Sequence, residues 1–335
     1  MSDQIIKAIN LTKIYNNSVL AVDHISFEVN RGEIFGLLGP NGAGKSTTIG
    51  MLTALLKPTE GTAIVNGFDV VKEPSSVRKT IGVVPQEYTA DEDLTGWENV
   101  ILIADFYGIP REVSRQRARE LLEMVGLAEA SKRKVETYSG GMRRRLELAM
   151  GLINRPSVLF LDEPTLGLDV QTRTAIWEYI KKLKSEYNMT ILVTTHYLEE
   201  ADQYCDRIAI IDRGRIIKVD SQDNLKRSIG GDIITVQLTR NGKEVNQALR
   251  EIQGVIEVID NGNGVITLKV TDGSAVAPVI ITELTRMNVG VNRLTLSRPS
   301  MDEVYMVYTG RNLREEQASS EEMFAMRRTL RRARS

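Results

Sequence analysis

The chain has 335 residues, a length that suits two domains of about 150 residues each. Lys and Arg number 43 against 44 Asp and Glu, so the basic excess of a dedicated nucleic-acid binder is absent. The single cysteine, Cys205, excludes a disulfide framework and a cysteine-cluster metal site within one chain. No apolar run reaches the roughly 18 residues that span a bilayer, and the first residues lack a secretory pattern. We therefore expect a cytosolic chain; for any membrane process, the membrane-crossing part would be another polypeptide.

The first two thirds of the chain alternate short apolar runs with amphipathic ones. Residues 8–29 alternate as antiparallel hairpin strands do, and residues 93–150 are helix-rich. Between them and after them, five short apolar runs predict buried strands, at 33–39, 80–86, 157–162, 190–196 and 207–212. Strands that alternate with helices predict an α/β fold with a mainly parallel sheet, here with an antiparallel β addition and a helical insertion.

A second domain is predicted over residues 228–310, after a first domain of residues 1–227. Its strands and helices follow the order β-α-β-β-α-β, and the sequence NGNG at 261–264 supplies a hairpin turn. This order predicts a small α+β, ferredoxin-like domain. At its end, Val304, Tyr305 and Tyr308 have helical spacing, which suits either docking on another surface or packing in the domain's own core. The charged tail, 311–335, is predicted to be mobile, with contact to anionic lipid as the alternative.

A glycine-rich loop follows the predicted strand at 33–39 and precedes a helix. It satisfies the pattern G-x-x-x-x-G-K-[ST] in the context that the pattern requires. Its residues are Gly39, Pro40, Asn41, Gly42, Ala43, Gly44, Lys45, Ser46 and Thr47. Backbone N–H groups of such a loop converge on phosphate oxygens at a helix N-terminus. Lys45 can reach the β- and γ-phosphates of a nucleotide, and the Ser46 hydroxyl can ligate Mg²⁺. The alternative is a turn with a surface lysine.

An acidic pair, Asp162 and Glu163, ends the apolar run SVLFLDEP. Open α/β sheets bind ligands at the carboxyl ends of their strands, where this pair is placed. Asp162 can hold Mg²⁺ through water, and Glu163 can orient or deprotonate an attacking water molecule.

The stretch YSGGMRRRLELAM, at 138–150, predicts a loop that opens a helix. The N–H groups of Ser139, Gly140 and Gly141 suit a phosphate. Three successive helical positions point in different directions, so the arginines at 143–145 do not form one flat patch. We interpret them as a solvated or phosphate-adjacent face; a nucleic-acid patch is the alternative.

In this order, the motifs resemble those of the ATP-binding-cassette (ABC) superfamily over residues 4–220. Tyr15 stands where such cassettes have an aromatic residue that stacks on adenine. After it come the glycine loop, Gln86, the signature at 138–142, the acidic pair, GLD at 167–169 and His196. The stretch 297–311, SRPSMDEVYMVYTGR, narrows the resemblance to daunorubicin-resistance-type ATP-binding subunits, which pair with ABC-2-type permeases. Tyr138 and Met142 depart from the usual LSGGQ.

The resemblance implies a role for each motif residue. Tyr15 stacks on adenine, the glycine loop with Lys45 holds the phosphates, and Glu163 is the general base. Ser46, Gln86 and a water-linked Asp162 hold Mg²⁺, and His196 contacts the γ-phosphate. Asp169 belongs to the interface of a head-to-tail homodimer, in which Ser139 and Gly141 of one chain complete the site of the other.

The function that this implies is the ATP-hydrolysing subunit of an exporter for a drug or another hydrophobic cargo. It would act at the inner face of the cell membrane through a separate permease, with import left open and nucleic acid not expected as a partner. One alternative is a non-transport ABC ATPase of the ribosome or DNA. Such proteins carry two cassettes or long coiled coils, and only about fifty residues separate Gln86 from Ser139 here. The other is a regulatory module, which intact Lys45, Glu163 and His196 argue against.

Overall fold

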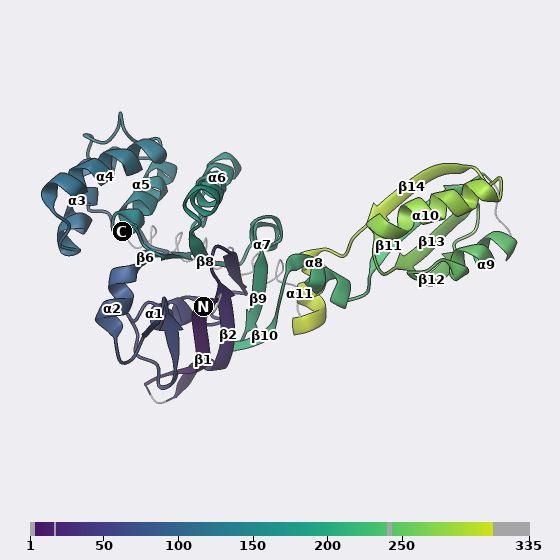
Figure 1. Cartoon of the computed structure of the whole chain (residues 1–335), viewed down its shortest axis with the longest axis horizontal. Helices are drawn as coiled ribbons and strands as arrows, with labels where there is room; N and C mark the ends of the chain where they lie inside the picture. Colours follow the sequence, from purple (N-terminus) through teal and green to yellow (C-terminus); the bar gives the residue numbers. More distant parts are fainter. Residues whose placement is uncertain (1–3, 17, 240–242, 311–335) are drawn as a thin grey trace, which may run out of the picture. The chain divides into compact units, whose positions relative to one another are not determined.

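The computed structural model describes residues 4–16, 18–239 and 243–310. The chain divides into two compact units, Met1–Val219 and Asp220–Ser335 (Figure 1). The charged tail predicted at 311–335 lies outside the described residues.

The first unit contains a six-stranded sheet in the order β10-β9-β3-β8-β7-β6. Its strands are β3 (Ile34–Leu38), β6 (Ile81–Val84), β7 (Val158–Asp162), β8 (Thr190–Thr195), β9 (Arg207–Asp212) and β10 (Arg215–Asp220). β3 lies parallel to β8 and β9, and β7 lies parallel to β6 and β8. The five predicted strands and the mainly parallel sheet are confirmed; β10 was not predicted.

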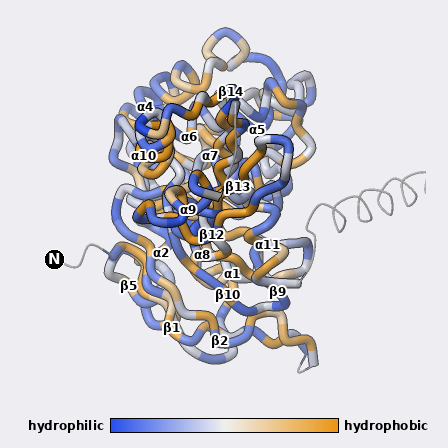
Figure 2. The backbone as a smooth tube through the Cα atoms, turned by 90° about the vertical axis from the view of Figure 1, so that its right-hand side faces the viewer, coloured by the Kyte–Doolittle hydropathy of each residue, from blue (hydrophilic) through white to orange (hydrophobic). Residues whose placement is uncertain are grey.

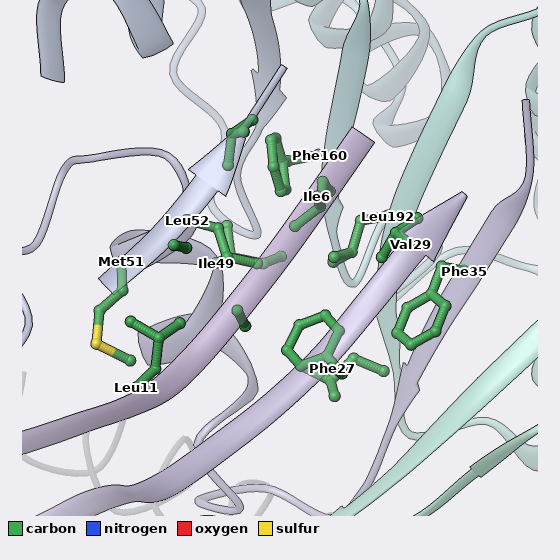
Figure 3. Packing of buried hydrophobic residues seen from close by; sticks show 14 of the residues in the cluster. Ile6, Leu11, Phe27, Val29, Phe35, Ile49, Met51, Leu52, Phe160 and Leu192 are labelled. Atoms are coloured by element: carbon green, nitrogen blue, oxygen red, sulfur yellow. The ribbon is translucent and has the colours of Figure 1, made fainter. Parts of the chain in front are cut away.

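An antiparallel sheet of the same unit has the order β2-β1-β4-β5. It consists of β1 (Gln4–Tyr15), β2 (Val19–Asn30), β4 (Glu60–Val65) and β5 (Phe68–Asp69). The predicted hairpin is β1–β2, whereas β4 and β5 were not predicted. Buried side chains from both sheets and from α1 (Lys45–Leu52) form one core (Figure 3). Within it the rings of Phe27 and Phe35 stack with their centroids 5.4 Å apart, which joins β2 to β3.

Helices connect the parallel strands. The connection from β6 to β7 carries α3 (Gly96–Phe106), α4 (Arg111–Met124), a 3-10 turn (Val135–Thr137) and α5 (Gly140–Leu152), which is the predicted helical insertion. The other helices of this unit are α2 (Pro74–Thr80), α6 (Val170–Tyr187) and α7 (Leu198–Tyr204). α3 begins at a capping box in which Thr95 and Glu98 exchange hydrogen bonds, so its first turn is fixed by sequence.

The second unit has an antiparallel sheet in the order β12-β13-β11-β14. Its elements are α8 (Gln222–Ser228), β11 (Asp232–Leu238), α9 (Lys243–Glu251), β12 (Val255–Asp260), β13 (Val265–Val270), α10 (Gly273–Arg286), β14 (Val291–Ser297) and α11 (Met301–Thr309). From β11 to β14 this is the predicted β-α-β-β-α-β order, with the first and third strands at the centre of the sheet. The turn between β12 and β13 contains Asn263 and Gly264 at positive φ, as the NGNG sequence requires.

One face of this sheet is covered by α9 and α10. The inward side chains of β11 alternate with exposed ones, and Leu249 and Ile280 bring the apolar faces of the two helices into the same core. In α11, Val304 and Tyr305 are fully buried, and the Tyr308 hydroxyl lies 2.7 Å from Ser228 Oγ. Packing within the chain is therefore the better interpretation of these three residues.

Hydrophobic and hydrophilic stretches alternate along the backbone of both units (Figure 2). Within the residues that the structure describes, no helix combines the length and the apolar character needed to cross a membrane.

Ile280→Ala should loosen the second unit, because it removes a side chain that is 0% exposed in the core under α10. Large-to-small changes at such positions cost about 2–5 kcal/mol. Hydrogen exchange followed by mass spectrometry should show faster exchange in β11 and β13 and unchanged exchange in β3 and β7. The neighbouring Ile281 is 44% exposed, so Ile281→Ala is the matched control and should leave both regions as in the wild type. Equal exchange in the two variants would contradict this packing.

Candidate functional site

Three neighbouring strands of the parallel sheet deliver the predicted site residues to one edge. β3 ends at the glycine loop, β7 ends before Glu163, and β8, which lies between them, ends before His196. In register, Leu38 pairs with Thr195 and Asp162 pairs with Thr194. The carboxyl ends of these strands therefore lie together, which is where such sheets bind ligands.

The glycine loop has a conformation and a packing that require glycine. Gly42 and Gly44 have φ of 82° and 101°, a region that side chains with a Cβ rarely adopt. A Cβ on Gly39 would lie 2.2 Å from the Ile211 carbonyl oxygen, and one on Gly44 would lie 2.6 Å from that of Ala21. The loop thus lies close against neighbouring backbone at both ends. It leads into the N-terminus of α1, where backbone N–H groups and the helix dipole favour an anion.

The Lys45 ammonium group is buried beneath this loop, with 5% of its side chain exposed. It donates hydrogen bonds to the carbonyl oxygens of Gly39, at 2.9 Å, and Pro40, at 3.0 Å. Its third contact is an ion pair with Glu163 Oε1 at 2.9 Å. The cation is therefore held in a fixed place at the centre of the site.

Glu163 connects Lys45 to His196. Its other oxygen, Oε2, lies 3.0 Å from His196 Nδ1, and its backbone N–H donates to Thr194 Oγ1 at 2.9 Å. Burial by itself would raise the pKa of Glu163. The hydrogen bond with His196 and the Lys45 charge outweigh burial and lower the pKa to about 2. At neutral pH Glu163 is a carboxylate, the form in which it can accept a proton.

The predicted magnesium ligands are oxygen donors of the kind that Mg²⁺ prefers. Asp162 is buried at the end of β7, and its Oδ1 accepts a hydrogen bond from Thr194 Oγ1 at 2.5 Å. Ser46 is exposed in the first turn of α1, and Gln86 is exposed just after β6. Ser46 and Asp162 extend from elements that meet at the same sheet edge, so their chemistry and their placement fit the ion.

The signature residues open α5 as predicted. Ser139 Oγ caps the helix by accepting from the Met142 N–H at 3.3 Å, and Ser139 and Gly140 are exposed. A Cβ on Gly141 would lie 2.4 Å from Thr172 Cγ2 on α6. The N-termini of α5 and α6 are therefore in contact.

Asp169 is the N-cap of α6. Its carboxylate accepts from the Thr172 N–H at 3.0 Å and from the Thr172 hydroxyl at 2.6 Å. Tyr15 is half-buried at the end of β1, with the Lys13 ammonium 5.3 Å from its ring centroid. The roles of Asp169 at a dimer interface and of Tyr15 against adenine stay predictions.

The interpretation of the three arginines as a solvated or phosphate-adjacent face is wrong for Arg144. Arg144 is almost fully buried and donates to backbone carbonyls of the loop after β6. Arg143 pairs with Glu92, and Arg145 donates to the Val125 carbonyl at 3.0 Å. Sequence reasoning also missed Glu147, although this acid stands alone in the apolar run LELAMGLI, which was a usable signal.

A cavity of about 460 Å³ lies elsewhere in the first unit. Pro156, just before β7, and Met189, just before β8, are among its lining residues. It therefore lies at the amino ends of these strands, on the edge opposite the glycine loop, and is not part of this site.

Family models match both parts of the chain. A model described as "ABC transporter" matches residues 22–166, and one described as "ATP-binding protein DrrA1-3-like, C-terminal domain" matches residues 221–309.

Curated relatives match over nearly the whole chain. The chain is 41% identical to the daunorubicin/doxorubicin resistance ATP-binding protein DrrA of Streptomyces peucetius, over 91% of this chain and 92% of the relative. It is 39% identical to the linearmycin resistance ATP-binding protein LnrL of Bacillus subtilis, over 92% of this chain and 100% of the relative.

Among solved structures, the chain is similar to a dimeric ATP-binding cassette, MJ0796, in a post-hydrolysis state bound to ADP and phosphate. The TM-score is 0.59 at 30% identity, over 65% of this chain and 98% of the other. The part of this chain that matches is of the size of the first unit.

The low pKa of Glu163 predicts a pH-dependent contribution to stability. Its pKa is about 2 in the folded chain against an ordinary 4.5, so its stabilising effect is full above about 4.5 and is lost as the pH falls toward about 2. Wild type should therefore be more stable than Glu163→Gln near neutral pH, by on the order of 3 kcal/mol. This difference should shrink between about pH 5 and pH 2 in urea unfolding followed by fluorescence. Glu112→Gln, at a side chain that is 90% exposed, is the control and should match wild type throughout.

Proposed function

Because this chain belongs to the ABC transporter family, as an ATP-binding subunit of the DrrA type, we propose that it drives export of a drug-like, hydrophobic cargo through an ABC-2-type permease. The chain is the ATP hydrolase of an ABC exporter. The permease type, the cargo class and a position on the inner face of the cell membrane are the proposed parts. The names of the relatives support the cargo class: two are resistance proteins, and another, from Ralstonia nicotianae, is a Nod factor export ATP-binding protein with 42% identity over 70% of this chain. The permease type rests on the resemblance of residues 297–311 to subunits that pair with ABC-2-type permeases, and the membrane position rests on the transporter role.

The observation that carries the catalytic assignment is the buried series Lys45–Glu163–His196. A cation that already lies under the glycine loop can bind the β- and γ-phosphates of ATP without a large movement. A γ-phosphate that shared Lys45 would weaken one of the two interactions that lower the pKa of Glu163. Glu163 would then become a stronger base at the moment when the attacking water molecule needs one.

His196 and the oxygen ligands complete the proposed roles. His196 holds the second oxygen of Glu163, so it orients the carboxylate and can itself contact the γ-phosphate. Ser46, Gln86 and, through water, Asp162 would hold Mg²⁺, which neutralises phosphate charge when it is bound. Tyr15 is proposed to stack on adenine.

A head-to-tail homodimer is proposed as the working unit. Ser139 and Gly140 are exposed at the start of α5, and Asp169 is exposed at the start of the adjacent α6. The N-terminus of α5 presents N–H groups to an anion from outside the chain, and Asp169 at the start of α6 lies on the same surface. The γ-phosphate bound by a second copy is such an anion, and a related cassette was solved as a dimer. Arg144 is buried, so this surface lacks the central cation of the nucleic-acid alternative.

The second unit is proposed to serve assembly, while the chemistry stays in the first. The predicted first domain ends at residue 227, whereas the first compact unit ends at Val219. Most of α8 lies between these two limits. α11 exposes two apolar side chains, Met306 at 49% and Val307 at 63%, beside the buried Val304 and Tyr305. These exposed residues are the proposed contact with the permease or with the second copy.

Glu163→Gln should abolish nearly all hydrolysis and keep ATP binding, because the amide retains the shape of the carboxylate but cannot take a proton from water. Phosphate release should fall by roughly a hundredfold or more, and gel filtration with MgATP should show a persistent dimer. Lys45→Ala is the contrasting variant, since it removes the buried cation and should weaken ATP binding itself in an equilibrium titration. Wild-type turnover in Glu163→Gln would remove this residue from the role of general base.

Val307→Asp should weaken recovery of the permease in an affinity pull-down, because it places a charge on the proposed apolar contact of α11. ATP affinity should stay within about twofold of wild type, since the nucleotide site lies in the first unit. Val279→Asp, at another exposed apolar residue of the second unit, is the matched control and should recover the permease normally. Equal recovery by both variants would rule out α11 as the helix that docks on the permease.

A further inference from the structure

The loop at 85–90, which carries Gln86, is held by side chains from α5. Arg144 is 1% exposed, and its guanidinium group donates to the carbonyl oxygens of Pro85, at 2.8 Å, and Gln86, at 2.9 Å. The planar guanidinium group therefore binds the carbonyl groups of two successive residues, and the second of them, Gln86, is the residue proposed to reach Mg²⁺.

Glu147 holds the other end of the same loop. It is 2% exposed, and its Oε1 accepts from the N–H groups of Thr89, at 2.6 Å, and Ala90, at 2.8 Å. Its Oε2 accepts from the Thr89 hydroxyl at 2.8 Å. Arg144 and Glu147 are three residues apart on α5, so they lie on one face of the helix and reach the loop together.

Tyr88, in the middle of the loop, makes the third connection. Its hydroxyl donates to the Gly140 carbonyl oxygen at 3.3 Å, and the Arg144 guanidinium carbon lies 5.0 Å from its ring centroid. The hydrogen bond of Tyr88 therefore connects the loop directly to the signature, because Gly140 is the residue after Ser139.

We propose that Arg144 and Glu147 are positioning residues that make the loop at 85–90 and the start of α5 move as one body. The position that Gln86 takes at the nucleotide of its own chain then sets the position of Ser139, which faces the nucleotide of the partner. This inference rests on the proposed head-to-tail dimer and goes beyond it, because it names the residues through which one site acts on the other.

The chemistry of these contacts favours rigid coupling. The loop lies outside the strands, so no sheet ladder supplies hydrogen-bond partners for its carbonyl and N–H groups, and side chains of α5 supply them instead. Two buried charged groups are costly to desolvate, and apolar side chains would fill the space at lower cost. Apolar side chains cannot hydrogen-bond to backbone groups, however, whereas charge-assisted hydrogen bonds fix both distance and direction.

The test uses mixed dimers of the full chain, isolated with two different affinity tags. The reference dimer pairs wild type with Glu163→Gln, so that hydrolysis occurs only at the wild-type site, which uses the signature of the Glu163→Gln chain. The test dimer adds Glu147→Ala to that same Glu163→Gln chain. The added change is then remote from the live nucleotide and can act on it only through the signature that this chain supplies.

We expect hydrolysis in the test dimer to fall by about tenfold or more relative to the reference dimer, because three hydrogen bonds to a buried charge are lost. Glu147→Gln in place of Glu147→Ala should restore most of the rate. Its amide oxygen can still accept from both N–H groups, and its NH₂ can donate to the Thr89 hydroxyl. A restored hydrolysis rate would show that Glu147 acts through its hydrogen bonds to the loop and that its negative charge is not required.

Equal rates in the reference and test dimers would overturn the inference. If Glu147→Ala proves unable to bind MgATP with wild-type affinity, Thr89→Ala replaces it; this change removes only the 2.8 Å hydroxyl contact and should lower the rate by about threefold. An unchanged rate with Thr89→Ala would then overturn the inference. High activity in a Glu163→Gln homodimer would instead show that the proposed general base is wrong, which is a separate result.

Discussion

The buried carboxylate of Glu163 is the constraint on which the site depends. It lies between Lys45 and His196, so one side chain joins residues that follow β3, β7 and β8. Each of these strands is parallel to a neighbour in the same sheet, and only this topology places their ends at one edge. The close packing of Gly39 and Gly44 against neighbouring backbone then fixes the loop above Lys45. The parallel sheet, the glycine loop and the ion pair of Lys45 with Glu163 therefore fix one another's positions.

The sequence predicted these parts well because their signals are local. A short apolar run followed by an acidic pair, or by glycines and a lysine, indicates both the strand and the group at its end. β4, β5 and β10 were missed because they are short or half-exposed strands without a clear alternation. Arg144 was missed for a different reason: its partners lie more than fifty residues away along the chain, so helix geometry alone places its side chain in solvent.

In the second unit, the burial of side chains decides between two interpretations of a helical pattern that the sequence leaves open. Val304, Tyr305 and Tyr308 share a helical spacing, and spacing alone does not tell a docking face from a core face. In the structure Val304 and Tyr305 are buried and Tyr308 lies within hydrogen-bonding distance of Ser228, so the exposed apolar residues of α11 are their neighbours along the chain. The core under α9 and α10, by contrast, is predictable from periodicity alone, because Leu249 and Ile280 belong to continuous apolar faces of their helices.

The contact between Gly141 and Thr172 has a consequence for how mutations in the signature are understood. A methyl group at Gly141 would lie 2.4 Å from Thr172 Cγ2, and Thr172 is the residue that Asp169 caps. Alanine at this glycine would therefore separate two helices within one chain before any second copy is met. Ser139 has a different environment, since it is exposed and bonds only its own helix among the contacts described. Substitutions at Ser139 thus test the proposed recognition between copies, whereas those at Gly141 report first on folding within a single copy.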